Sequence, residues 1–206
     1  KLVKQIKPDI LDVHFLTVFG YLGYASGFHP FIMSVWGSDI LIEPENSILA
    51  GWAAKRVLKR ADFVTCTSEL LYNTLKKYTS LNKVKILPFG VDCERFKPRP
   101  EKEAKSFKTI GIIKALEPVY GIEYLIQAVP FIVKEFKDLK VLIVGGGNQE
   151  PYKKLARETD VENFIKFVGK VTEKDLPEYL AQMDVFVMPS LSESEAVAAQ
   201  EAQAME

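Results

Sequence analysis

The stretch Lys140-Val141-Leu142-Ile143-Val144-Gly145-Gly146-Gly147 joins an uninterrupted apolar run to three successive glycines. Such a run is typical of a strand buried on both faces, as in a parallel sheet covered by helices. In open sheets of this kind, ligands bind beyond the carboxyl ends of the strands. Glycines directly after a strand let backbone N–H groups approach a phosphate at the start of the next helix. The stretch therefore predicts an α/β fold and indicates which end of the sheet binds ligands.

Similar apolar runs recur on both sides of this stretch and alternate with segments of helical periodicity. The predicted strands are 10–15, 31–36, 63–67, 84–88, 109–113, 140–144, 164–168 and 185–188. The predicted helices are 47–59, 69–78, 121–136, 151–159 and 173–181. In the third helix, apolar residues recur at helical spacing and indicate one packed face. The alternation predicts parallel sheets with helices on both faces, arranged as two Rossmann-like halves.

A break in the pattern divides the chain. The segment from Phe96 to Ser106 contains prolines and charges but no periodicity, as expected of a linker. We therefore predict a first domain over 1–97, a linker over 98–106 and a second domain over 107–206. An alternative is that the two four-strand halves share one sheet or barrel, because each half lacks partners to cover its sheet edge.

Composition limits the classes of partner. The 27 basic and 27 acidic residues balance, so no net charge favours nucleic acid, and membrane contact is expected to be peripheral at most. The apolar region 14–33 contains three glycines and a proline and is too interrupted for a spanning helix. Cys66 and Cys93 are predicted to be buried, reduced thiols in strand-like segments, which favours a cytoplasmic location.

Several common motifs are absent from the sequence. The glycine run lacks the third glycine of a dinucleotide fingerprint, because Glu150 occupies that position. His14 and His29 are not spaced as metal ligands, and there is no Gly-x-Ser-x-Gly elbow. We therefore predict no cofactor and no metal site. The sequence Trp36-Gly37-Ser38-Asp39 follows a predicted strand, and Ser38 or Asp39 is interpreted as a cap of the next segment or as part of a site.

Several short segments recur in a fixed order along the chain: KPDILDVH (7–14), PFIMSVWGSD (30–39), ADFVTCTS (61–68), ILPFGVD (86–92), KALEP (114–118), YGIEYLI (120–126), LIVGGG (142–147), FVGKV (167–171) and DVFVMPS (184–190). The pair Glu193 and Glu201, separated by seven residues, follows them. In order and type, these segments and the pair resemble a known family, the retaining GT-B glycosyltransferases that include glycogen synthases and many mannosyl- and glucosyltransferases (glycosyltransferase family 4 type).

The resemblance implies roles for individual residues. Glu193 would face the donor hexose and Glu201 would accept hydrogen bonds from the ribose diol, as an ionised carboxylate can. Glu193 and Asp39 are the implied catalytic residues. The implied donor-binding residues are Lys114, Gly146, Gly147, Gly169, Val171, Ala196, Val197 and Glu201. The implied partners are a UDP-, GDP- or ADP-hexose donor and a sugar or lipid-linked acceptor, the latter near His14, Trp36 and Asp39.

The chain also departs from the family pattern. Val119-Tyr120 occupies the place of the second basic residue that usually grips the donor diphosphate. Glu195-Ala196 replaces an aromatic residue and a glycine, so we expect an acid facing the donor and strain if position 196 needs φ > 0. Gln200 and Glu206 stand where Leu-like and Gly-like residues are expected, and Trp36 stands where many relatives have histidine.

Compared with the family, the chain also looks truncated at both ends. A member of this family is expected to begin with a further strand and a glycine-rich loop and to continue beyond Met205. We therefore expect a parent that transfers a hexose with retention of configuration and a fragment that is inactive as given. The alternative is a non-enzymatic α/β scaffold or an engineered fragment.

Overall fold

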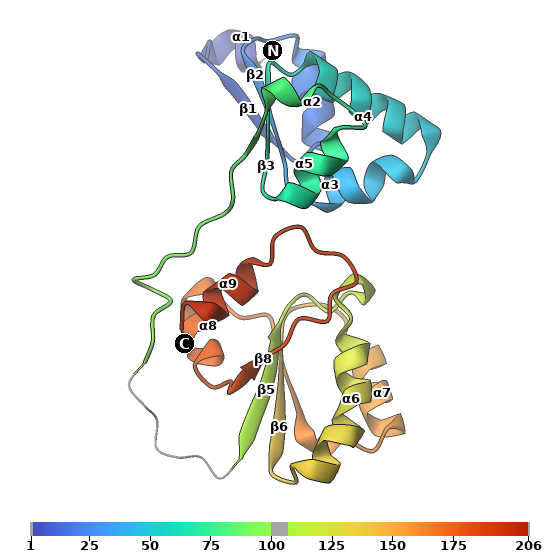
Figure 1. Ribbon diagram of the computed structural model, residues 1–206, viewed down its shortest axis with the longest axis vertical. Helices are drawn as coiled ribbons and strands as arrows, with labels where there is room; N and C mark the ends of the chain where they lie inside the picture. Colours follow the sequence, from blue (N-terminus) through green and yellow to red (C-terminus); the bar gives the residue numbers. More distant parts are fainter. Residues whose placement is uncertain (1, 100–106, 206) are drawn as a thin grey trace. The chain divides into compact units, whose positions relative to one another are not determined.

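The computed structural model describes residues 2–99 and 107–205 (Figure 1). The chain divides into two compact units, Lys1–Phe89 (unit 1) and Gly90–Glu206 (unit 2). Each unit contains one sheet of four parallel strands, so the alternative in which both halves share one sheet or barrel is wrong. Most of the expected linker 98–106 lies outside the described residues.

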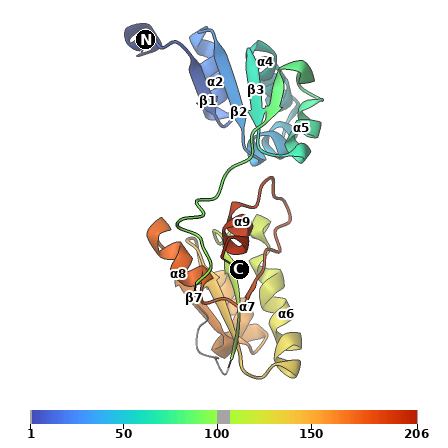
Figure 2. The same ribbon diagram turned by 60° about the vertical axis from the view of Figure 1, so that its left-hand side comes forward.

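Unit 1 has the strand order β1-β2-β3-β4, and all neighbouring strands are parallel. Its core contains the side chains of Phe31, Met33 and Val35 from β2, packed with residues of the neighbouring strands and helices. Figures 1 and 2 show α2, α4 and α5 on the same side of this sheet. The elements are α1 (Leu2–Ile6), β1 (Leu11–His14), α2 (Val18–Ser26), β2 (Phe31–Val35), α3 (Ser38–Leu41), η1 (Glu43–Glu45), α4 (Ile48–Arg60), β3 (Phe63–Cys66), α5 (Glu69–Leu75), η2 (Leu81–Lys83) and β4 (Val84–Ile86).

Helix α2 was not predicted from the sequence, because Gly20 and Gly23 lower its helix propensity. In the structure both glycines are buried where the helix packs closely on the sheet. A Cβ at Gly23 would lie 2.8 Å from a ring carbon of Phe31, and one at Gly20 would lie 3.0 Å from the sulfur of Met33. The helix ends at Gly27, which has the left-handed conformation (φ 66°) that glycine adopts without steric cost.

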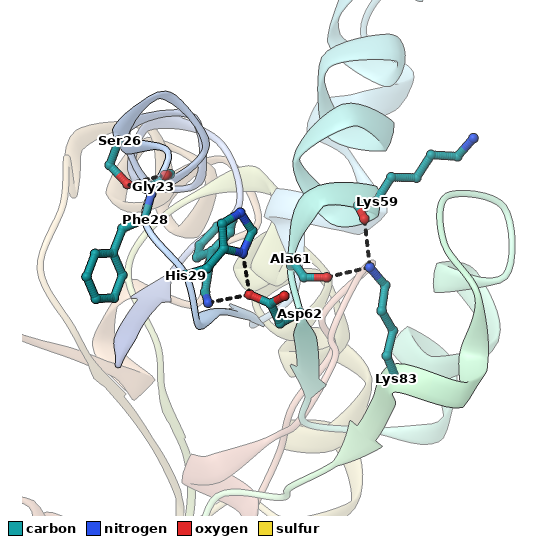
Figure 3. Close-up of polar contacts among 9 residues, drawn as sticks. Gly23, Ser26, Phe28, His29, Lys59, Ala61, Asp62 and Lys83 are labelled. Atoms are coloured by element: carbon teal, nitrogen blue, oxygen red, sulfur yellow. Dashed lines mark hydrogen bonds and ion pairs between the residues drawn. The ribbon is translucent and has the colours of Figure 1, made fainter. Parts of the chain in front are cut away.

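The amino ends of β2 and β3 are held together by a polar cluster (Figure 3). The Asp62 carboxylate accepts a hydrogen bond of 2.7 Å from the Phe31 backbone N–H. The same carboxylate oxygen lies 2.6 Å from His29 Nδ1. These two contacts hold the pKa of the Asp62 carboxyl below its usual value. Beside it, the Lys83 ammonium donates hydrogen bonds to the carbonyls of Lys59 and Ala61 and so closes the carboxyl end of α4.

Unit 2 has the strand order β7-β6-β5-β8, again all parallel. Helix α6 buries Ile122, Leu125, Ile126 and Val129, which confirms the predicted packed face. Figures 1 and 2 show α6 and α8 on opposite sides of the sheet. The elements are β5 (Lys108–Ile113), η3 (Pro118–Tyr120), α6 (Ile122–Glu135), β6 (Leu139–Val144), α7 (Glu150–Glu158), η4 (Glu162–Phe164), β7 (Ile165–Gly169), η5 (Glu173–Asp175), α8 (Leu176–Leu180), β8 (Val185–Phe186) and α9 (Val197–Gln203).

The predicted α/β class and all eight predicted strands are confirmed. The prediction for the cysteines is only half right: Cys66 is buried in β3, but Cys93 is exposed in a turn. Burial raises the pKa of the Cys66 thiol to about 11. Within the described residues, none of the helices combines the length and apolar character that crossing a membrane requires.

Candidate functional site

The candidate site lies in unit 2, at the carboxyl ends of its strands. Lys114 directly follows β5, and Glu193 lies in the loop between β8 and α9. Although 79 positions separate them, Lys114 Nζ donates a hydrogen bond of 2.6 Å to Glu193 Oε2. The two side chains are only 16% and 24% exposed, so this charge-assisted contact is shielded from solvent. Two residues that the resemblance assigned to one donor site therefore lie in direct contact.

Tyr120 lies next to this ion pair, where the family pattern has a basic residue. Lys114 Nζ is 4.8 Å from the centre of the Tyr120 ring, which is a cation–π distance. Burial raises the pKa of the Tyr120 phenol, and the charges of Glu117 and Glu193 add to this effect. At neutral pH the Tyr120 ring is therefore uncharged, and it adds no positive charge beside the Lys114 ammonium group.

The glycine run after β6 lets two loops approach each other closely. A Cβ at Gly145 would lie 1.7 Å from the Lys114 carbonyl oxygen, so only glycine fits there. The Gly146 carbonyl accepts a hydrogen bond from Leu116 N–H, and Gly147 forms a parallel bridge with Leu116. Gly146 and Gly147, predicted to bind the donor, thus first serve to pack the loop after β6 against the one that carries Lys114.

Two contacts hold the loop that carries Glu193. The Leu191 N–H donates to the Val119 carbonyl at 2.9 Å. Gly121 has φ 64°, and a Cβ there would lie 2.2 Å from the Pro189 carbonyl oxygen. Residues 189–191 therefore pack against the turn η3 and the start of α6, which places Glu193 beside Lys114.

The unusual residues in and near α9 form their own contacts. Gln200 Nε2 donates to Glu195 Oε1 at 3.2 Å, so two of the departures from the family pattern pair with each other. The expectation of strain at Ala196 is wrong, because its φ is −85° and alanine adopts this value freely. Glu206, the last of these residues, lies outside the described residues.

Glu201 lies on α9 and follows Glu193, which is in the preceding loop, by eight positions. Burial raises the pKa of the Glu201 carboxyl above its usual value. The positive charge of Arg95 opposes this increase and the negative charge of Glu173 adds to it. The carboxylate therefore lacks part of its normal solvation and would gain from hydrogen-bond donors such as a vicinal diol.

Two further polar groups lie on the segments that surround the ion pair. Glu123 is in the first turn of α6, and Ser190 is in the loop between β8 and α9. Within the described part of the chain, Glu123 Oε2 and Ser190 Oγ are buried without a hydrogen-bond partner. Buried polar atoms of this kind are normally satisfied by water or a ligand. Neither residue was singled out from the sequence. A buried polar atom without a hydrogen-bond partner can be recognised only in the three-dimensional structure.

The remaining predicted donor-binding residues lie at the end of β7, just beyond it, and at the start of α9. The Gly169 carbonyl accepts a hydrogen bond from Gly145 N–H, and its φ of 87° favours glycine. Val171 is half-buried two positions further along, and Val197 is the first residue of α9. In residues 2–99 and 107–205, the structure brings no three His, Cys, Asp or Glu side chains together as metal ligands would be.

Asp39, the other predicted catalytic residue, lies in unit 1 and is fully buried. Its carboxylate accepts backbone hydrogen bonds from Leu16 at 2.8 Å, Trp36 at 3.1 Å and Gly37 at 2.7 Å. Asp39 lies within α3, whose N-cap is Gly37 and has no side-chain cap hydrogen bond, so its carboxylate binds the loops before the helix instead of capping it. These contacts make Asp39 the residue that fixes the loops after β1 and β2.

Two families match the sequence over most of its length. The family described as "Glycosyl transferases group 1" matches residues 94–206, and the family described as "Glycosyl transferase 4-like" matches residues 1–68. The first match covers the ion pair, the glycine run and α9. The second covers the first three strands of unit 1.

Curated relatives agree with these matches. The chain is 32% identical over 171 residues to a GDP-mannose-dependent alpha-(1-6)-phosphatidylinositol monomannoside mannosyltransferase of Mycobacterium tuberculosis (strain CDC 1551 / Oshkosh), covering 74% of this chain and 44% of that protein. It is 27% identical over 203 residues to the putative teichuronic acid biosynthesis glycosyltransferase TuaC of Bacillus subtilis (strain 168), covering 92% and 49%. The chain thus spans less than half the length of these relatives.

Solved structures share the fold. The sucrose-phosphate synthase of Thermosynechococcus elongatus has a TM-score of 0.83 at 19% identity, covering 98% of this chain and 55% of that one. The pneumococcal O-GlcNAc transferase GtfA, solved with UDP and GlcNAc, has a TM-score of 0.68 at 16% identity, covering 98% and 42%. Two Rossmann-like units of this kind define the GT-B fold class. The chain belongs to the glycosyl transferases group 1 family.

Proposed function

We propose that the protein is part of a glycosyltransferase that moves a hexose from a nucleotide-sugar donor to a sugar-bearing acceptor with retention of configuration. The observation that carries this proposal is the shielded contact between Lys114 and Glu193 at 2.6 Å. It joins a cation suited to a diphosphate and a carboxylate suited to a hexose at the ligand-binding edge of a parallel sheet.

Unit 2 would bind the donor. The Lys114 ammonium would contact the diphosphate and stabilise the negative charge that develops as the sugar–phosphate bond breaks. Glu193 would accept hydrogen bonds from hexose hydroxyls, and Glu201 would accept two from the ribose diol. Glu123 and Ser190 supply further polar atoms on the adjoining segments. In this arrangement no metal ion is assigned to the diphosphate.

Donor binding is expected to be weak. Lys114 is already paired with Glu193, and Tyr120 replaces a second cation. The absence of one charge-assisted contact to a desolvated diphosphate costs on the order of 1.5–3 kcal/mol, or about tenfold to hundredfold in affinity. We propose that this 206-residue chain binds a donor without sustained turnover.

Thermal unfolding with millimolar UDP-glucose, GDP-mannose or ADP-glucose tests the proposal. A ligand that binds only the folded state raises the unfolding midpoint. The expected result is a rise with one donor that is lost in Glu201→Ala. A matched control is Glu135→Ala, which removes an exposed acid at the end of α6 and should keep the rise. No rise with any donor, in a chain that unfolds cooperatively, would favour a non-enzymatic α/β scaffold.

A further inference from the structure

Unit 2 has a cavity at the edge of its sheet opposite the candidate donor site. The cavity lies at the amino ends of β5, β6 and β7 and encloses about 350 Å³. Along β6, five positions separate Lys140 at the cavity from Gly145 at the donor site, which is about 16 Å of extended strand. The cavity is therefore a separate place in the same unit. Its lining includes Phe107, Lys140, Leu142, Asn163, Phe164 and Lys166.

Two lysines of this cavity share one face of the sheet. Val141 and Ile143 on β6 pack in the core with α6. Lys140 and Leu142 alternate with them and therefore point to the other face, on the side of α8 (Figures 1 and 2). Lys166 on β7 is paired with Leu142 and shares this face. From the spacing of parallel strands, the Cα atoms of Lys140 and Lys166 lie about 8 Å apart, so both ammonium groups can reach one anion.

These two ammonium groups lack a carboxylate partner. Within residues 2–99 and 107–205, neither Lys140 nor Lys166 forms an ion pair, and none of the described lining residues is acidic. The nearby acid Asp184 has other partners. Its carboxylate accepts a hydrogen bond of 2.7 Å from the Thr109 N–H and lies 3.9 Å from Lys108 Nζ. Two neighbouring cations without a counter-ion favour an anion between them.

Aromatic rings form apolar walls beside these cations. Lys140 Nζ lies 3.5 Å from the centre of the Phe107 ring, a cation–π contact that holds the ammonium at the cavity wall. Phe164 is half-buried, packs against the core and also lines the cavity. The volume is near the lower limit for small-molecule sites, which suits a single ring with one charged group.

We propose that this cavity binds a small aromatic carboxylate, with its ring against Phe107 and Phe164 and its carboxylate on the ammonium groups of Lys140 and Lys166. Each ammonium would donate a charge-assisted hydrogen bond to one carboxylate oxygen. The ring would leave water for the apolar walls, which adds to the affinity. This ligand site belongs to unit 2 alone and does not rest on the proposed transferase function.

Two-dimensional amide NMR of the 206-residue chain tests the site. The probe is benzoate, and the comparison compounds are benzamide, which has the ring without the charge, and acetate, which has the charge without the ring. We expect benzoate to cause saturable shifts of the Leu142, Asn163 and Phe164 amide signals. Benzamide and acetate should each bind at least about tenfold more weakly, since one lacks the charge-assisted contacts and the other lacks the apolar surface.

Variants assign the binding to the two lysines. Lys140→Gln and Lys166→Gln should each weaken benzoate binding about threefold or more, and the double variant should weaken it further. The matched control is Lys154→Gln, which removes an exposed lysine of the same unit on α7 and should leave the affinity unchanged. The amide spectrum of each variant also shows whether it is folded.

The outcomes separate this site from the donor site. The absence of saturable shifts, an affinity for acetate or benzamide equal to that for benzoate, or an unchanged affinity in the double variant overturns the proposal. Shifts centred on Gly146 and Gly147 instead would place the anion at the candidate donor site and also overturn it. Benzoate binding at the amino ends, in a chain that no nucleotide sugar stabilises, supports this site and contradicts only the donor assignment of unit 2.

Discussion

Asp39 in unit 1 and Glu193 in unit 2 are both carboxylates that follow parallel strands, but they have opposite kinds of partner. Asp39 is fully buried and accepts three hydrogen bonds from backbone N–H groups. Glu193 is partly exposed and pairs with the flexible side chain of Lys114. Backbone partners cannot leave without unfolding a loop, whereas a lysine can exchange one anion for another. Asp39 is therefore suited to a structural role that fixes nearby loops, whereas Glu193 is suited to contact a ligand.

The largest effect is expected for Asp39→Ala. The buried N–H groups of Leu16 and Gly37 and the part-buried N–H of Trp36 would lose their acceptor, at about 1 kcal/mol each, so unit 1 should lose about 3 kcal/mol of stability. Both tryptophans lie in unit 1, so urea unfolding followed by tryptophan fluorescence reports this unit alone. Asp39→Asn, which keeps an acceptor oxygen, should lose less. A loss below about 1 kcal/mol in Asp39→Ala would contradict the structural role.

Lys114→Met should change both binding and stability. Glu193 is 24% exposed and keeps only part of its hydration, so the loss of its partner should cost about 1–3 kcal/mol of stability. Affinity for the stabilising nucleotide sugar should fall about tenfold to hundredfold, measured by calorimetric titration. Lys140→Met on β6, whose ammonium lies over Phe107, is the control. An equal loss of affinity in both variants would show that Lys114 acts only through the net positive charge of the protein and not through direct contact with the ligand.

A smaller effect is expected from Glu201, with a defined dependence on pH. Because burial raises the pKa of this carboxyl, the folded chain binds its proton more tightly than the unfolded chain does. The free energy of unfolding should therefore fall as the pH rises just above the ordinary pKa of a carboxyl group, and it should level off at higher pH. Glu201→Gln should lack this decline and be more stable at neutral pH. Scanning calorimetry across that range measures it, and an unchanged profile would refute the assignment.

The smallest effect is expected for Asp62→Asn. The Phe31 N–H and His29 lower the pKa of the Asp62 carboxyl. The ionised carboxylate therefore stabilises the fold at pH values above the ordinary carboxyl pKa, and this stabilisation is lost as the pH falls below that pKa. Because His29 and Asp62 are about half exposed, the loss at neutral pH should be at most about 1 kcal/mol. Tryptophan-monitored unfolding at neutral and acidic pH measures it, with the exposed Asp9→Asn as control. A loss that persists in acid would point to another cause.

Sequence predicted the fold better than it predicted the contacts of the site. The strands were found because buried parallel strands are continuous apolar runs, and α6 was found from its periodicity. Helix α2 was missed because its glycines pack against β2, which is a tertiary effect. The glutamates and Lys114 were assigned only by resemblance. The hydrogen bond between Lys114 and Glu193, 79 positions apart, and the contact of Lys114 with the Tyr120 ring depend on how the loops fold together. The local sequence pattern does not specify this arrangement.

The close packing of Gly145 against the Lys114 carbonyl has a consequence for protein engineering. Gly145, after β6, packs against the Lys114 carbonyl after β5 and donates its N–H to the Gly169 carbonyl at the end of β7. The loops after these three strands are therefore in contact with one another. An insertion or deletion in any one of them would displace the other two. Libraries that vary this candidate site should therefore keep all loop lengths and vary side chains, beginning at Val119 and Tyr120.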